Sequence, residues 1–309
     1  MNKVTISAYE LMGKFPNEEA ARLHIEQKRW GTQSVCAYCG CTDNQYKTTR
    51  DGKAGYYNCY HCKKVYTVRT GTIFERSHVP LDKWLFAFYL VVTSRKGISS
   101  LQLSKEIGVT QKTAWFMLQR IREACKDDNS DSGALRGIVE VDETYIGGKE
   151  ANKHASKKLR AGRGAVGKTA VLGMRERGGN FKGKVLKDTT INSIQSSLNE
   201  VIADGATLCT DEHGAYIGNK FNHLTVNHSA KQFVDGMAHT NSIESVWAVL
   251  KRGFYGVYHS FGTKHLQRYI DEFSYRLNEG NCKVHTIERI DALLGKAFST
   301  KISYKVLTA

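Results

Sequence analysis

Two pairs of cysteines near the N-terminal end of the chain have the spacing of a metal site. One Cys-x-x-Cys pair is Cys36 and Cys39, and the other is Cys59 and Cys62. Each pair can bind a metal ion from one short turn, and two such turns supply the four thiolates of a tetrahedral zinc site. The nineteen residues between the pairs contain an Asp-Gly turn signal, which favours a small β-hairpin. The sequence therefore predicts a zinc ribbon with one structural Zn²⁺; disulfides or redox dithiols are the alternative.

Basic and aromatic residues alternate around these cysteines. The set comprises Tyr46, Lys47, Arg50, Lys53, Tyr56, Tyr57, Tyr60, Lys63, Lys64, Tyr66 and Arg69. Such interleaving suits contact with a phosphate backbone and with stacked bases. A ribbon that only makes a small domain rigid and contacts protein is the alternative.

Three carboxylates in the second half of the chain have a different pattern. Asp142 lies in a β-strand predicted over 137–148, and Asp211 follows a second short apolar strand. Glu244 lies on a predicted helix over 239–253, which Gly253 closes. Two Mg²⁺ ions about 4 Å apart require several anionic oxygens to hold them against their repulsion. The order and positions of these acids predict a two-metal phosphoryl-transfer site, whereas each acid taken singly is typical of a solvated surface residue.

The elements that must position these acids lie between them in the sequence. Two further strands are predicted at 169–175 and 184–187, and a helix is predicted at 191–203. Glu244 and Lys251 are seven residues apart on the last helix, which is about two turns. Their side chains therefore project from nearly the same face of that helix.

Residues 99–122 predict a helix-turn-helix. A short helix ends at Gly108, and Thr110 caps a second helix with apolar residues at three- and four-residue steps. The start of the second helix in this motif lies beside base edges, which places Gln111, Lys112 and Thr113 there and Arg120 at phosphates. An ordinary αα-hairpin within a helical bundle is the alternative.

The composition is that of a basic globular protein. The 309 residues are 41% hydrophobic and 24% charged, which excludes wholesale disorder. The formal net charge of +15 predicts a polyanionic partner. Basic residues concentrate in the segment 149–168, which we expect to order on DNA through Lys157, Lys158, Arg160 and Arg163. Neither a membrane span nor a signal peptide is evident in the sequence, so we expect a cytoplasmic, nucleoid-associated protein.

Three stretches of the second half resemble a known family. They are VEVDETYIGGK (139–149), TDEHGAY (210–216) and HTNSIESVWAVLKRGFYGVYH (239–259). With the cysteine pairs, they make the chain similar to bacterial insertion-sequence transposases of the DDE class, in the ISXO-like group with an N-terminal zinc ribbon. The resemblance implies an α/β, ribonuclease-H-like catalytic domain with elements in the order strand-strand-strand-helix-strand-helix-strand-helix. It implies that Asp142, Asp211 and Glu244 bind Mg²⁺ in this domain. It also implies that Lys251 contacts DNA.

The expected organisation follows from these motifs. It comprises an N-terminal helical segment (1–30), a zinc ribbon (31–70), a helix-turn-helix region (78–126), a ribonuclease-H-like domain (136–260) with a basic insertion (149–168), and a C-terminal helical segment (261–309). The expected protein is a DNA transposase that binds the terminal inverted repeats of its element, exposes 3′-hydroxyl ends and joins them to target DNA. It would use two Mg²⁺ ions, or Mn²⁺ in their place.

Two ends of double-stranded DNA must be brought together for such a reaction, which favours a homodimer or a larger assembly. One alternative function is another ribonuclease-H-like nuclease, such as a resolvase, which would not join strands. The other is a zinc-ribbon regulator that binds DNA without catalysis.

Overall fold

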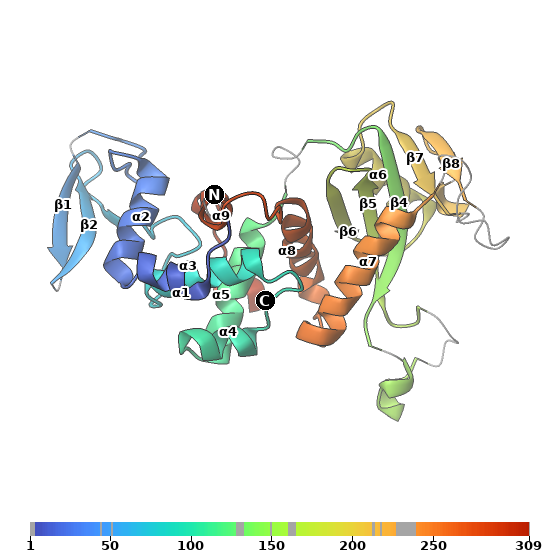
Figure 1. Cartoon of the computed structure of the whole chain (residues 1–309), viewed down its shortest axis with the longest axis horizontal. Helices are drawn as coiled ribbons and strands as arrows, with labels where there is room; N and C mark the ends of the chain where they lie inside the picture. The colour runs from blue at the N-terminus through green and yellow to red at the C-terminus, as the bar shows by residue number, and fades with distance from the viewer. Residues whose placement is uncertain are drawn as a thin grey trace. The chain divides into compact units, whose positions relative to one another are not determined.

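The computed structural model describes residues 4–43, 45–50, 52–127, 133–148, 150–159, 165–211, 214–216, 218–226 and 239–308. The chain forms two compact units, each with a sheet of its own (Figure 1). The first unit combines Met1–Cys125 with Gly280–Ala309, and the second is Lys126–Glu279. Within the described residues, no helix combines the length and the apolar composition needed to cross a membrane.

The first unit is mainly helical. Its helices are α1 (Ala8–Lys14), α2 (Glu18–Trp30), α3 (Leu81–Thr93), α4 (Ser100–Ile107), α5 (Gln111–Ala124), α9 (Thr286–Ser299) and α10 (Tyr304–Thr308). α3 is central, because α1, α2, α4, α5 and α9 all contact it. Large apolar side chains such as Trp84 and Phe88 are buried on α3, one helical turn apart.

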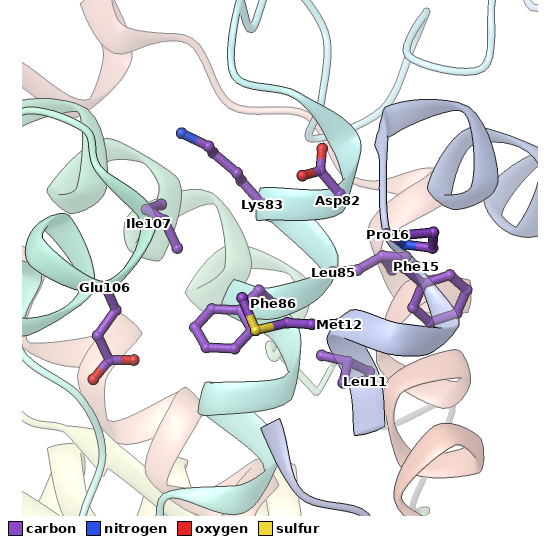
Figure 2. A pocket seen from close by; sticks show the side chains of 10 residues that line it. All are labelled: Leu11, Met12, Phe15, Pro16, Asp82, Lys83, Leu85, Phe86, Glu106 and Ile107. Atoms are coloured by element: carbon purple, nitrogen blue, oxygen red, sulfur yellow. The ribbon is translucent and has the colours of Figure 1, made fainter. Parts of the chain in front are cut away.

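A pocket lies where α1, α3 and α4 meet (Figure 2). Leu11 of α1 lines it, together with Phe15, which follows the last residue of that helix. The other apolar lining residues include Leu85 and Phe86 of α3 and Ile107 of α4. Leu11, Leu85 and Ile107 are also buried, so apolar contacts join α4 to the centre of the unit.

α4 and α5 are the two helices that the sequence predicts around Gly108 and Thr110. α4 ends at Gly108, whose φ of 63° and ψ of 51° are left-handed and favour glycine. The side chain of Thr110 begins α5 by accepting a hydrogen bond from the backbone N–H of Thr113 at 3.2 Å. Three residues, 108–110, therefore connect the helices, which is the usual length of turn in a helix-turn-helix.

A small antiparallel sheet completes the first unit. Its strands, in spatial order, are β1 (Gln45–Arg50), β2 (Lys53–Cys59) and β3 (Val65–Thr67). Tyr57 of β2 stacks on Tyr66 of β3 at 5.5 Å between ring centroids. Trp30, the last residue of α2, packs edge-on against both rings. The predicted hairpin is present, and α2 covers it.

The second unit is built on a five-stranded mixed sheet. Its strands, in spatial order, are β6 (Phe181–Val185), β5 (Thr169–Glu176), β4 (Ile138–Ile146), β7 (Thr207–Thr210) and β8 (Asn222–Thr225). β4, β5 and β6 pair antiparallel, whereas β7 pairs parallel to β4 and β8 parallel to β7. The helix α6 (Ile191–Val201) connects β6 to β7. This strand order and direction are those of the predicted ribonuclease-H-like fold.

Helices cover both faces of this sheet. α6 places Ile194 and Leu198 in one apolar cluster with Val139 and Val141 of β4. The helices α7 (Asn241–Gly253) and α8 (Leu266–Asn278) share a second cluster with Val171 of β5. Successive side chains of a strand point to opposite faces, so residues 140 and 142 face away from α6 and toward α7.

Two elements of the second unit differ from the sequence prediction. β6 begins at Phe181 rather than at 184, because Phe181 is buried in the cluster with α7 and α8. Between β7 and β8, where the family order has a helix, the described residues form one 3₁₀ turn, η3 (Gly214–Tyr216). Both differences concern segments too short for periodicity to define.

The C-terminal part of the prediction also needs correction. α7 ends at Gly253 as predicted, but Gly253 is not a left-handed cap, because its φ of −66° and ψ of −46° are helical and the chain continues into a π-helical turn over Phe254–Tyr258. Burial of Phe254 in the cluster beneath α7 accounts for this continuation. The segment 261–309 is divided between the units, since α8 belongs to the second and α9 and α10 to the first.

Candidate functional site

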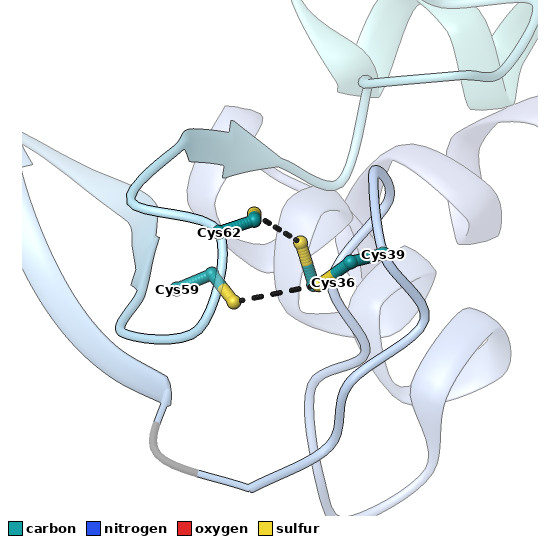
Figure 3. Close-up of side chains that lie close together, drawn as sticks. All are labelled: Cys36, Cys39, Cys59 and Cys62. Carbon is teal, nitrogen blue, oxygen red and sulfur yellow. Dashed lines mark hydrogen bonds between the residues drawn. The ribbon is translucent and has the colours of Figure 1, made fainter.

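The four predicted cysteines come together at one point of the ribbon (Figure 3). Their Sγ atoms all lie within 4.8 Å of one another, with Cys36 3.6 Å from Cys62 and Cys39 3.7 Å from Cys59. Four sulfurs bound to a tetrahedral Zn²⁺ at about 2.3 Å lie about 3.8 Å apart, so the cluster fits this ion. Cys41 lies outside the cluster and donates its thiol to the carbonyl of Asp43. The ribbon therefore carries a four-cysteine site for structural zinc, as the sequence predicts.

Both Cys-x-x-Cys turns use the same backbone hydrogen bonds. The N–H of Gly40 donates to the carbonyl of Cys36 at 2.9 Å, and the N–H of Lys63 donates to that of Cys59 at 2.8 Å. Gly40 and Lys63 have φ values of 72° and 58°. The backbone of each turn therefore reverses direction at the fourth residue after its first cysteine. The two halves of the zinc site are thus local structures, which is why spacing alone predicts them.

Asp142 lies in the middle of β4, level with the C-terminal end of its parallel neighbour β7, which Asp211 directly follows. β4 pairs with β7 in the register Glu140 to Cys209, and continuing it by two residues brings Asp142 level with Asp211. Burial raises the pKa of Asp142 to about 6, and the nearby carboxylates of Glu143 and Asp211 add to this increase. Mutual repulsion of this kind is relieved when a divalent cation binds between carboxylates.

The third predicted acid, Glu244, lies in the first turn of α7. It is exposed, and its Oε1 accepts a hydrogen bond from Oγ1 of Thr240 at 3.2 Å. One turn later, the indole N–H of Trp247 donates to Oδ2 of Asp142 at 3.0 Å. Lys251 is exposed one further turn along the helix. The structure therefore brings Asp142 and Asp211 together and packs the helix that carries Glu244 and Lys251 directly against Asp142.

The carboxylate group differs from the cysteine cluster in its spacing. Within the described part of the chain, the cysteines are the one group of three or more His, Cys, Asp or Glu residues whose ligand atoms all lie within 4.8 Å. Asp142, Asp211 and Glu244 do not form such a group. Their carboxylates are hard oxygen donors, which is the type of ligand that Mg²⁺ prefers.

Three of the predicted DNA contacts lie at the start of α5. Gln111 is exposed and donates to Oγ of Ser100 at 2.8 Å. Lys112 is exposed, and its ammonium lies 5.1 Å from the ring centroid of Tyr304 in α10. Thr113 is partly exposed, and its hydroxyl lies 2.9 Å from that of the cap residue. The structure therefore presents these residues at the surface, within one turn of the helix start.

Arg120 differs from the expectation that it contacts phosphates. Its guanidinium donates to the carbonyl of Ile73 at 2.6 Å and lies 4.2 Å from the ring centroid of Phe116. Only 7% of the residue is exposed. Arg120 follows Phe116 by one turn, so α5 directs both side chains into the same flank of the unit. Arg120 thus stabilises the packing of α5, and we do not retain it as a DNA contact.

Two family models match separate parts of this chain. The transposase zinc-ribbon domain matches residues 16–65, and the ISXO2-like transposase domain matches residues 134–278. The chain therefore carries a transposase zinc ribbon followed by an ISXO2-like transposase domain. The zinc-ribbon match includes α2 as well as the cysteines, in agreement with the packing of Trp30 on the ribbon.

A relative of this transposase is the uncharacterized protein in transposable element ISH50 of Halobacterium salinarum. It is 29% identical over 252 residues, which cover 77% of this chain and 83% of that protein. Two solved structures are also similar, the Mos1 strand transfer complex and the Mos1 transposase paired-end complex with left transposon end. Both have a TM-score of 0.29 and 12% identity. The first match covers 67% of this chain and 76% of the Mos1 chain, and the second covers 65% of this chain and 73% of the Mos1 chain. TM-scores this low do not establish a shared fold, so the fold assignment rests on the strand order described above.

The basic insertion of the transposase is described in part. Lys157 ends a short 3₁₀ turn, η2 (Ala155–Lys157), and Lys158 follows it. Both side chains are exposed. Arg160 and Arg163 lie outside the described residues. The two described lysines are therefore available to a partner, as a DNA contact requires.

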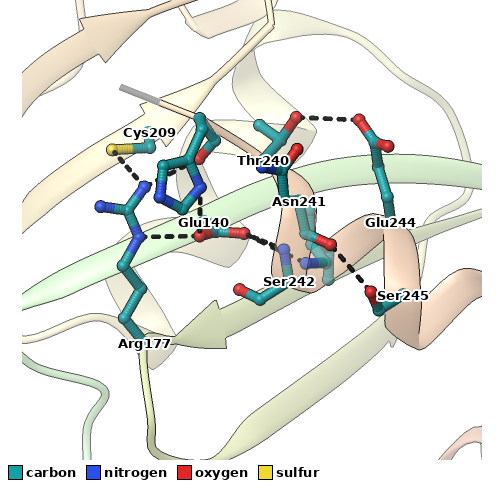
Figure 4. Close-up of polar contacts among 10 residues, drawn as sticks. Glu140, Arg177, Cys209, Thr240, Asn241, Ser242, Glu244 and Ser245 are labelled. Atoms are coloured by element: carbon teal, nitrogen blue, oxygen red, sulfur yellow. Dashed lines mark hydrogen bonds and ion pairs between the residues drawn. The ribbon is translucent and has the colours of Figure 1, made fainter. Parts of the chain in front are cut away.

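Sequence reasoning missed two residues of the transposase site, Glu140 and Trp247. Glu140 is completely buried, and its carboxylate bonds the start of α7 (Figure 4). The available signal was a carboxylate two residues before Asp142 within an otherwise apolar strand, because a buried charge needs partners. Trp247 lies three residues after Glu244, and a buried indole N–H likewise requires an acceptor.

Proposed function

We propose that this transposase binds the terminal inverted repeats of its element, hydrolyses a phosphodiester bond to expose a 3′-hydroxyl, and joins that end to target DNA. The observation that carries the proposal is the meeting of Asp142 of β4 with Asp211 at the C-terminal end of β7, with the Glu244 helix bonded to Asp142 through Trp247. Carboxylates drawn from two strands and a helix are a donor set for a pair of Mg²⁺ ions.

The chain's own residues have distinct tasks in this proposal. Asp142, Asp211 and Glu244 hold the cations, for which Mn²⁺ can substitute. The Trp247 N–H donates to Oδ2 of Asp142 and so orients the carboxylate that would bind a cation. Lys251, exposed two turns after Glu244, binds a phosphate of the DNA backbone.

Bound Mg²⁺ would lower the pKa of the attacking water or 3′-hydroxyl and stabilise the leaving oxygen. This chemistry needs no covalent intermediate on the protein. The work of the fold is therefore to hold the carboxylates and the DNA in register.

The first unit supplies DNA binding in this proposal. Gln111, Lys112 and Thr113 lie at the exposed start of α5, where a recognition helix contacts bases. The zinc ribbon presents exposed basic and aromatic side chains, including Tyr46 and Tyr60, to the DNA backbone. In the second unit, Lys157, Lys158, Arg160 and Arg163 of the basic insertion bind phosphates.

Transposition of one element requires both of its ends, so we propose a homodimer or larger assembly that holds two ends together. The site of action is the nucleoid in the cytoplasm, where the element and its target DNA lie. The two-fold relation of inverted repeats matches the symmetry of a dimer.

The experiment is cleavage of a labelled duplex that carries the element's terminal repeat, with Mg²⁺ and the full chain. We expect the wild type to nick at the element end and Asp142→Ala to be inactive. Asp204→Ala is the matched control, since Asp204 lies in the same unit but its side chain is 86% exposed and pairs with Lys220. Equal cleavage by wild type and Asp142→Ala would refute the proposed site.

The same reaction with an added plasmid separates the proposal from its alternatives. A transposase joins the labelled 3′ end covalently to the plasmid. Cleavage without joining would indicate a nuclease such as a resolvase, and binding without cleavage would indicate a regulator.

A further inference from the structure

Glu140 of β4 acts as the N-terminal cap of α7, although the two are about a hundred residues apart in sequence. Its Oε2 accepts hydrogen bonds from the backbone N–H groups of Ser242 at 2.8 Å and Ile243 at 3.1 Å (Figure 4). The N-cap residue Thr240 instead directs its hydroxyl to Glu244. A carboxylate at this place binds two N–H groups that the helix itself cannot pair, and it interacts favourably with the helix dipole.

Both carboxylate oxygens of Glu140 have polar partners. Its Oε1 accepts a hydrogen bond from Nε of Arg177 at 2.8 Å and lies 3.2 Å from Nδ1 of His239. Burial alone would raise the pKa of Glu140, but hydrogen bonds from Ser242, Arg177 and Ile243 hold this pKa below its ordinary value. Glu140 is therefore a buried carboxylate anion with a fixed set of partners, which suits an element that must not shift.

Trp247 makes the second polar contact between α7 and β4. Its indole N–H donates to Asp142 at 3.0 Å, and its ring lies on Gly173, the cross-strand partner of Asp142. A Cβ at Gly173 would lie 2.4 Å from Cζ2 of Trp247, so glycine at this position lets the ring reach Asp142. The backbone of β5 at Gly173 therefore sets how closely the indole ring approaches the sheet.

Glu244 lies between these two contacts, two residues after Ser242 and three before Trp247. A helix bonded to a strand on both sides of a residue can neither rotate nor slide at that residue without breaking a bond. We propose that Glu140 and Trp247 are positioning residues that hold α7 in register with β4 and so set the distance from Asp142 to Glu244 at which divalent cations bind. This inference rests on the proposed function, because it concerns the same carboxylates.

The test measures Mn²⁺ binding to the zinc-loaded full chain by isothermal titration calorimetry, without DNA. Trp247→Phe removes the N–H donor but keeps an aromatic ring, and Glu140→Gln keeps the shape but removes the charge. We expect the Mn²⁺ affinity to fall by about tenfold or more in each, as is usual when a residue that orients a metal ligand is changed. Circular dichroism and zinc content should remain those of the wild type.

The matched control is Trp84→Phe. Trp84 donates its indole N–H to Oγ of Ser77 at 3.1 Å in the first unit, so this variant loses a comparable bond. It should lose stability but keep the Mn²⁺ affinity of the wild type. Gly173→Ala provides a further variant, since it displaces the indole without altering any polar group, and it should also weaken Mn²⁺ binding.

The outcomes separate this inference from the proposed function. Wild-type Mn²⁺ affinity in folded Trp247→Phe would overturn the positioning role, whatever the behaviour of Glu140→Gln. Absence of Mn²⁺ binding by the wild-type chain would overturn the proposed function together with this inference. Weak binding by Trp247→Phe and Gly173→Ala with normal binding by Trp84→Phe would support both.

Discussion

The two candidate metal sites of this transposase are built in opposite ways. The zinc site takes its ligands from two short turns with the same backbone geometry, and its sulfurs already lie 3.6 and 3.7 Å apart in pairs. The acidic site takes Asp142, Asp211 and Glu244 from two strands and a helix, and its neighbouring carboxylates repel. Metal binding at the first site stabilises the fold around it. At the second site, repulsion between the carboxylates destabilises the metal-free fold, and packing of the surrounding residues must offset it.

This difference teaches which part of each site depends on the metal. A ribbon of three short strands has few buried apolar residues, so zinc must contribute much of its stability. The acidic site lies on a five-stranded sheet with apolar clusters on both faces, and we expect burial of these clusters to stabilise the sheet without a cation. Removing metal should therefore unfold one region and leave the other folded but inactive.

The largest effect should come from breaking the zinc site. Cys59→Ser removes one of four thiolates, and a structural zinc contributes on the order of 10 kcal/mol to the folding of a small zinc module. We expect loss of bound zinc and about 10³-fold weaker binding of the terminal repeat, as specific contacts fail. Atomic absorption and fluorescence anisotropy measure these quantities.

Cys41→Ser is the control for that experiment, because Cys41 lies outside the cluster. It should keep one zinc per chain and normal DNA binding. Specific binding that survives in the zinc-free variant would mean that the ribbon has no part in recognising the ends.

Asp211→Asn tests the acidic site in the same way. The loss of one anionic ligand should lower the rate of end cleavage by about 10³-fold, comparable to losing a group that stabilises the transition state directly. Zinc content, DNA affinity and the melting temperature should not fall, since the strands remain paired. Cleavage within a few-fold of the wild type would remove Asp211 from the site.

The pH dependence of stability should distinguish the two regions further. The pKa of Asp142 is raised to about 6, against about 4 in an unfolded chain. Between these values the metal-free folded protein binds more protons than the unfolded chain, so its stability falls as the pH rises from about 4 to about 6. Asp142→Asn should therefore stabilise the metal-free protein at pH 7.5, by on the order of 1 to 2 kcal/mol after allowance for partial solvation.

Asp188 provides the opposite sign for comparison. Hydrogen bonds from Ser193 and Thr190 lower the pKa of Asp188, so its ionised form stabilises the start of α6. Asp188→Asn should lower the melting temperature at pH 7.5, whereas Asp142→Asn should raise it. A lower melting temperature for Asp142→Asn would mean that its carboxylate is not repelled in the fold.

The smallest predicted effect concerns α5. Lys112→Ala should weaken DNA binding by about three- to tenfold and reduce the slope of log affinity against log salt by about one, because Lys112 is exposed. Arg120→Ala should instead lower the melting temperature of the first unit, because it breaks the bond to Ile73. Equal salt slopes for wild type and Lys112→Ala would exclude Lys112 as a phosphate contact.

Sequence reasoning succeeds here where structure is local. The cysteine spacing predicts the zinc turns, Gly108 and Thr110 predict the boundaries of α4 and α5, and branched residues predict the strands that carry Asp142 and Asp211. Each of these depends on fewer than about ten neighbouring residues, over which hydrogen bonding and periodicity are readable.

The failures arise where distant residues decide the outcome. The positive charge of Arg120 suggests a DNA contact. Its guanidinium instead donates to the carbonyl of Ile73, which lies 47 residues earlier in the sequence. Gly253 is the last residue of α7, but burial of Phe254 continues the chain into a π-helical turn instead of a left-handed cap. Glu140 looks like a neighbour of Asp142, yet its partners are the N–H groups of α7, whose position relative to β4 no local pattern specifies.

The most direct test of the account is the metal preference of Asp142→Cys in end cleavage. A thiolate binds the hard Mg²⁺ ion poorly but accepts the softer Mn²⁺ better, so changing a true ligand should change which ion supports the reaction. We predict that the wild type cleaves with either ion, and that Asp142→Cys cleaves with Mn²⁺ but not with Mg²⁺. Wild-type cleavage by Asp142→Cys in Mg²⁺ would contradict the assignment of Asp142 as a metal ligand.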